Sequence, residues 1–274
     1  MSQAAQTYRL AIAGLGAIGL AVARRIDTGA VPGMSLVAVS ARDRSRARDA
    51  VAGFKSPPPV LDLAHLADAA DVVVECLPSQ HFAEVAAPAV ERGRIFMPLS
   101  VGALLNHMPL VERARQTGAR IVVPTGALLG LDAVRAAAEG NMRSVTLETR
   151  KPPAGLAGAP LLVQRGISVE GLEKPLLVFE GSAREAIAGF PANVNVAVAL
   201  SLAGIGPDRT RVEIWADPGV TRNTHKVIVK SDSSDLTMTI ENIPSRENPR
   251  TGAITALSVL AALRRLTAPL VVGS

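Results

Sequence analysis

Hydrophobic residues in the first half of the chain come in short runs separated by stretches with helical spacing. The runs have the length of buried strands and cover residues 8–13, 36–40, 71–77, 94–99 and 120–123. The helical stretches between them cover residues 18–27, 45–54, 81–92 and 109–116. Because strands that alternate with helices build βαβ units, this half predicts a parallel sheet covered by helices.

The pattern changes after about residue 131, where apolar and polar positions begin to alternate. The period of two expected of half-buried strands occurs at residues 144–149, 211–216, 226–230 and 236–240. Few helices are predicted between these strands, which indicates a mainly antiparallel sheet. Residues 251–266 read as one long apolar helix, started by Thr251 after Pro249.

The first predicted strand is followed by the sequence GLGAIG at residues 14–19, which opens a predicted helix. In this strand–turn–helix context the glycines are the fingerprint of a dinucleotide-binding turn. Gly14 permits the tight turn, Gly16 lets the backbone approach a pyrophosphate, and Gly19 allows close helix–strand packing. Free N–H groups at the start of the helix, at Ala17 and Ile18, complete the expected phosphate site. A tight turn without a ligand is the alternative.

These patterns together predict an α/β chain with two domains. An N-terminal Rossmann dinucleotide-binding domain covers residues 1–130, and residues 248–274 pack back on it. Residues 131–247 form a second, α+β domain with a mainly antiparallel sheet, which carries catalysis and offers a surface for dimerisation.

The end of the second predicted strand bears on which dinucleotide is bound. An acidic residue that would hold the adenosine ribose of NAD is missing there, and Ser40-Ala41-Arg42 stands in its place, with Asp43 just beyond. Ser40 and Arg42 suit a ribose 2′-phosphate, because a guanidinium pairs with phosphate through two parallel hydrogen bonds. We therefore expect NAD or NADP as cofactor, with NADP accepted. A solvated basic helix start is the alternative explanation of Arg42 and of the arginines that follow it at positions 44, 46 and 48.

Composition narrows the class of partner. The net charge of +5 raises nucleic acid as a ligand, but the basic residues are dispersed and aromatics make up only 3%. No apolar run has the length of a membrane span, and no secretory signal is evident in the first residues. With a single cysteine, Cys76, no internal disulfide is possible, which favours the cytoplasm. We expect neither nucleic acid nor membrane as partner.

Several short segments, in order along almost the whole chain, resemble the L-aspartate dehydrogenase family. They are VEC at 74–76, SVGAL at 100–104, PTGA at 124–127 with GLD at 130–132, TRKPP at 149–153, FPANVNVA at 190–197, ADP at 216–218 with NTH at 223–225, and ENIPSRENPRT at 241–251. Thr125, where serine is common, and Leu128-Leu129, where Ile-Gly is frequent, depart mildly from the family pattern.

The resemblance implies reversible oxidation of L-aspartate to iminoaspartate, with hydride passing to the nicotinamide. The imine feeds NAD biosynthesis or hydrolyses to oxaloacetate and ammonia, and the reverse reaction is the reductive amination of oxaloacetate. In this family the catalytic histidine corresponds to His225, and dinucleotide contacts correspond to Ala127 and Asn195. The resemblance also implies a homodimer.

Read without the resemblance, His225 is one of four histidines and lies between a turn and an alternating strand of the second domain. A histidine, with a pKa of roughly 6.5, can take a proton from an amine or activate water near neutral pH. A structural histidine at a strand start is the alternative.

A dicarboxylic amino acid needs cations and N–H donors around its carboxylates. Arg150 and Lys151, at the end of a strand, are candidates, although a solvated strand end explains them equally well. Asn193 either binds substrate or caps the apolar helix predicted at residues 194–203. Asn195 is predicted to lie too far inside that helix for capping, so we expect it to contact the nicotinamide ribose or carboxamide.

Two other site types are not favoured by the sequence. Cys76 ends a strand without a histidine near it, so we expect a buried, unreactive thiol and not a catalytic one. No metal-binding motif occurs. Two alternatives to an aspartate dehydrogenase remain open: a related dehydrogenase or imine reductase acting on another amine, and a non-catalytic dinucleotide-binding regulator.

Overall fold

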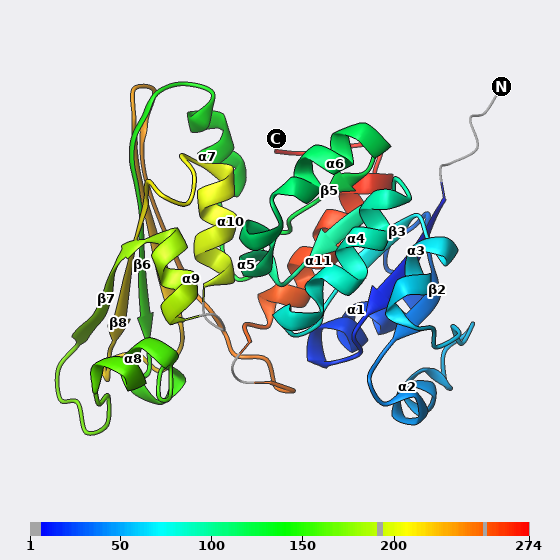
Figure 1. Cartoon of the computed structure of the whole chain (residues 1–274), viewed down its shortest axis with the longest axis horizontal. Helices are drawn as coiled ribbons and strands as arrows, with labels where there is room; N and C mark the ends of the chain where they lie inside the picture. The colour runs from blue at the N-terminus through cyan, green and yellow to red at the C-terminus, as the bar shows by residue number, and fades with distance from the viewer. Residues whose placement is uncertain (1–6, 191–193, 249–250, 274) are drawn as a thin grey trace. The chain divides into compact units, whose positions relative to one another are not determined.

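The computed structural model describes residues 7–190, 194–248 and 251–273. The chain divides into two compact units (Figure 1). The first contains the residues up to Pro124 together with Thr255–Val271, and the second contains Thr125–Ile254 together with the residues from Val272 onward. The last long helix therefore belongs to the same unit as the N-terminal sheet.

A five-stranded parallel sheet forms the centre of the first unit. Its strands are β1 (Tyr8–Ala13), β2 (Met34–Ser40), β3 (Val72–Glu75), β4 (Ile95–Pro98) and β5 (Arg120–Ile121). They lie in the order β2-β1-β3-β4-β5 with parallel pairing throughout. Because the chain leaves β1 in one direction to form β2 and returns on the other side to form β3, the strand order reverses between β1 and β3. Ligands of open parallel sheets bind at the carboxyl ends of strands at such a switch point.

Helices flank this sheet. They are α1 (Ala17–Asp27), α2 (Arg44–Val51), α3 (Leu66–Ala69), α4 (Phe82–Glu91), α5 (Val101–Leu104), α6 (Pro109–Thr117) and α11 (Ile254–Thr267). Val259 and Leu263 of α11 are fully buried in the core that Leu10 and Ile12 of β1 form with Val22 of α1. The predicted start of α11 at Thr251 was wrong by one turn, because residues 251–253 form a bend and an isolated bridge before the helix.

A second five-stranded sheet forms the other unit. Its strands are β6 (Met142–Lys151), β7 (Leu176–Ser182), β8 (Thr210–Ala216), β9 (Thr224–Ser231) and β10 (Asp235–Glu241). In the order β10-β9-β6-β8-β7, only β6 and β8 pair in parallel, so the sheet is mixed and mainly antiparallel as predicted. The predicted fold class is confirmed for both units.

The second unit contains more helix than the alternating pattern predicts. Its helices are α7 (Leu131–Ala138), α8 (Pro160–Arg165), α9 (Ala183–Gly189) and α10 (Asn195–Ala203). In Figure 1, α7, α9 and α10 lie along one face of this sheet. They cover the apolar side chains of β6 and β8, including Val145, Leu147, Val212 and Ile214, all of which are buried. The helices α7, α8 and α9 and the strand β7 were missed because their apolar positions are too few to establish a period, whereas α10 corresponds to the helix predicted at residues 194–203.

Among the described residues, no helix has both the length and the apolar character that crossing a membrane requires.

Candidate functional site

The glycine turn lies at the carboxyl end of β1, next to the switch point. Gly14 adopts a positive φ of 98°, and a Cβ there would lie 2.7 Å from the carbonyl oxygen of Cys76. A Cβ at Gly19 would lie 1.9 Å from the carbonyl oxygen of Gly14, so both positions require glycine. In the turn, the backbone of Gly14 therefore lies close to that of Cys76, and α1 packs closely against β1.

The start of α1 is open to an anion. Gly16 is the N-cap residue, no side chain caps the helix, and no atom would lie within 4 Å of a Cβ at Gly16. The first turn of α1, which includes Ala17 and Ile18, contains no acidic residue. Unsatisfied N–H groups and the positive end of the helix dipole are thus available to a phosphate. These features fit the pyrophosphate of a nicotinamide dinucleotide.

The end of β2 lies beside this turn. Ser40 is buried, and its carbonyl oxygen accepts a hydrogen bond from the Gly14 N–H at 2.7 Å. Arg42 is exposed, whereas Arg44 binds Asp62 and the carbonyl oxygen of Val60. Asp43 caps α2 by accepting from the Arg46 N–H at 3.0 Å. The carboxylate nearest to the end of β2 is therefore engaged in its own helix.

His225 lies on β9 directly opposite Thr149 of β6, and only 3% of each residue is exposed. The His225 Nδ1 is 3.1 Å from the Thr149 Oγ1. Burial, with a smaller contribution from the charge of Lys151, lowers the pKa of His225 to about 3. The imidazole is consequently neutral at physiological pH.

Lys151 follows two residues after Thr149 on β6, so both side chains project from the same face of the sheet as His225. Lys151 is 5% exposed, and burial lowers its pKa to about 8. One buried cationic group thus accompanies a neutral imidazole. A buried cation beside a proton acceptor is suited to a carboxylate ligand that carries a proton-donating group.

Arg150 and Lys151 are neighbours in sequence but project from opposite faces of the sheet. Arg150 donates to Glu148 at 2.6 Å and to Asp217 at 2.9 Å, and its guanidinium carbon lies 4.9 Å from the centre of the Trp215 ring. Of the two cations predicted to bind substrate, the structure brings only Lys151 to the face that carries His225.

Of the two predicted asparagines, the structure describes only Asn195. Asn193 lies outside the described residues. Asn195 is the first residue of α10, with Val194 as N-cap, so the prediction that it lies well inside the helix was wrong. The apolar run that begins at Val194 hides the true start because Val194 is buried without being helical. Asn195 is exposed at this helix end.

Ala127 lies in the loop that precedes α7. Its carbonyl oxygen accepts a hydrogen bond from the Asn242 Nδ2 at 3.0 Å, while the Asn242 backbone N–H donates to Asn223 at 2.8 Å. Asn242 is 4% exposed, and sequence reasoning assigned it no role. It links the loop of Ala127 to the segment that leads into His225.

The thiol of Cys76 is not poised for nucleophilic chemistry. Although the residue as a whole is half-buried, burial of the thiol and the adjacent Glu75 carboxyl raise the Cys76 pKa far above its ordinary value. A thiol with a raised pKa is a poor nucleophile at neutral pH.

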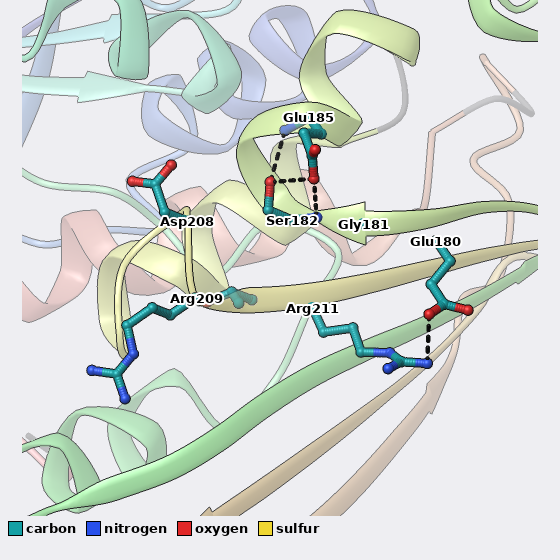
Figure 2. A pocket seen from close by; sticks show the side chains of 8 residues that line it. Glu180, Gly181, Ser182, Glu185, Asp208, Arg209 and Arg211 are labelled. Carbon is teal, nitrogen blue, oxygen red and sulfur yellow. Dashed lines mark hydrogen bonds and ion pairs between the residues drawn. The ribbon is translucent and has the colours of Figure 1, made fainter.

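A shallow polar pocket elsewhere in the second unit contains none of the predicted residues. It lies where β7 leads into α9 and beside the start of β8 (Figure 2), lined by Glu180, Gly181, Ser182, Glu185, Asp208, Arg209, Thr210 and Arg211. Arg211 pairs with Glu180 at 2.9 Å, Asp208 pairs with Arg184, and Ser182 forms a capping box with Glu185. Because these charges neutralise one another, we assign the pocket no ligand.

Comparison with known proteins gives the family. Residues 132–266 match the family described as aspartate dehydrogenase, C-terminal, and residues 14–124 match the NAD-binding domain of homoserine dehydrogenase. An L-aspartate dehydrogenase of Bradyrhizobium diazoefficiens is 54% identical over 99% of this chain and 96% of its own. One from Methanocella arvoryzae is 44% identical over 97% of this chain and 100% of its own.

A solved structure agrees with the fold. The crystal structure of an aspartate dehydrogenase from Thermotoga maritima superposes with a TM-score of 0.75 and 24% identity, covering 98% of this chain and 100% of its own. The relatives that span the whole length, together with the dinucleotide-binding turn, decide the assignment. The chain belongs to the L-aspartate dehydrogenase family and is an NAD(P)-dependent amino-acid dehydrogenase.

Proposed function

We propose that this enzyme oxidises L-aspartate to iminoaspartate reversibly, with His225 as the residue that accepts the proton of the substrate amine. The observation that carries the proposal is the buried group formed by Thr149, His225 and Lys151 on one sheet face. The names of the full-length relatives support aspartate as the substrate.

The amino group must lose protons as the Cα–N bond becomes an imine. When His225 Nδ1–H donates to the Thr149 Oγ1, the lone pair of Nε2 is left to accept one of them. The dinucleotide, when bound on the glycine turn, supplies the nicotinamide carbon that takes the hydride from Cα. Aspartate and the oxidised dinucleotide thus give iminoaspartate, the reduced dinucleotide and one proton.

The charge of Lys151 makes the basicity of His225 depend on whether substrate is bound. In the absence of substrate, its charge helps to hold the pKa of His225 at about 3, where imidazole is a weak base. A substrate carboxylate on the Lys151 ammonium offsets that charge and so raises the basicity of His225. Proton acceptance is then favoured when a dicarboxylate is bound. Arg150, which is already paired with Glu148 and Asp217, is a weaker candidate for that carboxylate.

The cofactor preference follows from the end of β2. The Asp43 carboxylate, which would repel a 2′-phosphate, is engaged as the cap of α2. Arg42, in contrast, is exposed. We propose that NADP is accepted alongside NAD, with Ser40 and Arg42 at the phosphate and Ala127 and Asn195 as further dinucleotide contacts.

Hydrolysis of the imine gives oxaloacetate and ammonia, and the reverse reaction is their reductive amination. We propose that the imine is withdrawn for NAD biosynthesis in a cytoplasmic setting, where a single cysteine suits reducing conditions.

We propose a homodimer built on the sheet face that carries Arg150. Glu148 and Arg150 of β6 and Lys226 of β9 place charges of both signs there, so a two-fold axis can bring opposite charges of two copies together. Trp215 lies on the same face, and its Nε1 is buried without a hydrogen-bond partner among the described residues. Light scattering of the purified enzyme should give twice the chain mass, and Trp215→Glu should give the monomer. A monomeric wild-type enzyme contradicts this arrangement.

One assay tests the proposed substrate. Initial rates are measured with L-aspartate and with L-glutamate, L-alanine and L-asparagine, and in reverse with oxaloacetate and ammonia. We expect kcat/KM for aspartate to exceed that for alanine and asparagine by about a hundredfold or more, because both lack the second carboxylate. The advantage over glutamate should be about tenfold or more, because one extra methylene displaces its carboxylate. Preference for another amine supports the related dehydrogenase, and tight dinucleotide binding without turnover supports a regulator.

A further inference from the structure

Glu75 is a completely buried carboxyl group at the carboxyl end of β3, next to the glycine turn. It is 0% exposed and pairs in register with Ala13 of β1 and Pro98 of β4. The mechanism above gives it no task. Its position at the switch point between β1 and β3 is where an open parallel sheet binds its ligand.

The carboxyl group joins the two loops that follow β3 and β4. It accepts hydrogen bonds from the Leu77 N–H at 2.6 Å and from the Ser100 N–H at 3.0 Å. The Leu77 side chain in turn reaches the glycine turn, since a Cβ on Gly14 would lie 2.9 Å from its Cδ2. Glu75 therefore fixes the backbone that forms a wall against Gly14.

The Ser100 hydroxyl makes two oxygen contacts with a single hydrogen. Its Oγ lies 2.7 Å from the carbonyl oxygen of Leu77 and 3.1 Å from the Glu75 Oε1. Ser100 Oγ is the donor in both contacts, so its one hydrogen is shared between the two acceptors in a three-centre hydrogen bond. Together with the Leu77 and Ser100 N–H groups, the hydroxyl completes three donors to the Glu75 carboxyl.

We propose that Glu75 is a positioning residue of the dinucleotide site and acts by holding the backbones of Leu77 and Ser100 together beside the glycine turn. Burial raises the pKa of Glu75, whereas the hydrogen bonds from Ser100, Leu77 and Leu99 lower it. The inference rests on dinucleotide binding at the glycine turn and not on which amine is oxidised.

Binding of the reduced dinucleotide, followed by its fluorescence without any substrate, tests the positioning role. Glu75→Gln keeps the shape of the side chain but has one acceptor oxygen for the Leu77 and Ser100 N–H groups, so its Kd should rise about threefold. Glu75→Ala should bind about tenfold more weakly, equivalent to about 1.4 kcal/mol. Glu91→Gln, on the exposed ion pair with Arg113, is the control and should not change Kd. Wild-type affinity in Glu75→Ala overturns the positioning role.

If Glu75→Ala does not fold, Ser100→Ala serves instead, because it removes the hydroxyl that bridges Glu75 and Leu77. Its Kd should rise about threefold at an unchanged Tm, and wild-type affinity in Ser100→Ala overturns the positioning role. None of these outcomes depends on the substrate, so they are separate from failure of the aspartate assay.

Discussion

Thr149 and His225 face each other across β6 and β9, and their side chains meet at 3.1 Å between Oγ1 and Nδ1. The contact occupies one of the two ring nitrogens inside a buried environment. The other nitrogen is thereby committed to the substrate side of the proposed chemistry. The cross-strand pair of Thr149 and His225 thus stabilises the sheet and also orients the proposed base.

Replacing Thr149 by valine keeps the shape of the side chain and removes the hydroxyl. We expect kcat to fall about tenfold, because a buried imidazole nitrogen loses its partner at a cost of about 1–3 kcal/mol. Thr149→Ser should retain most of the rate. Thr146→Val, on the same strand but the opposite face, is the control. Steady-state kinetics that show wild-type kcat in Thr149→Val contradict the orienting role.

The affinity for L-aspartate should fall as the pH rises through about 8. Lys151 loses its proton there because burial lowers its pKa to about 8, and a neutral amine no longer attracts the substrate carboxylate. KM should therefore be low below that pH and increase above it, while Lys151→Gln should show a high KM at every pH. A KM of the wild type that stays constant across this range excludes Lys151 as the carboxylate partner.

Lys151 should also cost stability, in a manner that depends on pH. Its pKa is about 8 in the folded protein and roughly 10.4 in an unfolded chain, so between these values the unfolded state binds more protons. The free energy of unfolding therefore rises with pH across this window. Lys151→Met should be more stable than wild type at neutral pH by about 3 kcal/mol. This difference should shrink toward pH 10, as measured by denaturant titration, and a constant difference contradicts the assignment.

Arg42→Ala tests the choice of dinucleotide. Loss of the guanidinium should raise KM for NADP about tenfold and leave KM for NAD within about twofold, since only NADP carries the 2′-phosphate. Arg46→Ala, in the first turn of α2, serves as control. An unchanged ratio of the two KM values would place the 2′-phosphate elsewhere.

The parallel sheet and its glycine turn could be predicted because their signals are local. The strand Tyr8–Ala13 was predicted with its observed bounds. In the turn, only glycine fits at positions 14 and 19. The mixed sheet could be predicted from its alternation, but β7 and the short helices α8 and α9 could not. Their stability comes from packing on the sheet and not from their own pattern.

The candidate site could be predicted only in part. His225 was proposed through family resemblance, whereas the strand register was needed to separate Lys151 from Arg150 and to find Thr149 opposite the histidine. Neighbours on a strand point to opposite faces, so a pair such as Arg150-Lys151 always divides between them. The buried state of Glu75 was not evident, since a carboxyl group at a strand end is usually solvated.

The central claim is that His225 accepts the amine proton in the oxidation of L-aspartate. It is tested most directly by kcat/KM for L-aspartate in wild type and His225→Gln, with dinucleotide Kd and Tm measured on both. We predict a loss of about a hundredfold or more in kcat/KM, the scale of general-base catalysis, at unchanged Kd. Full kcat/KM in His225→Gln would contradict the claim.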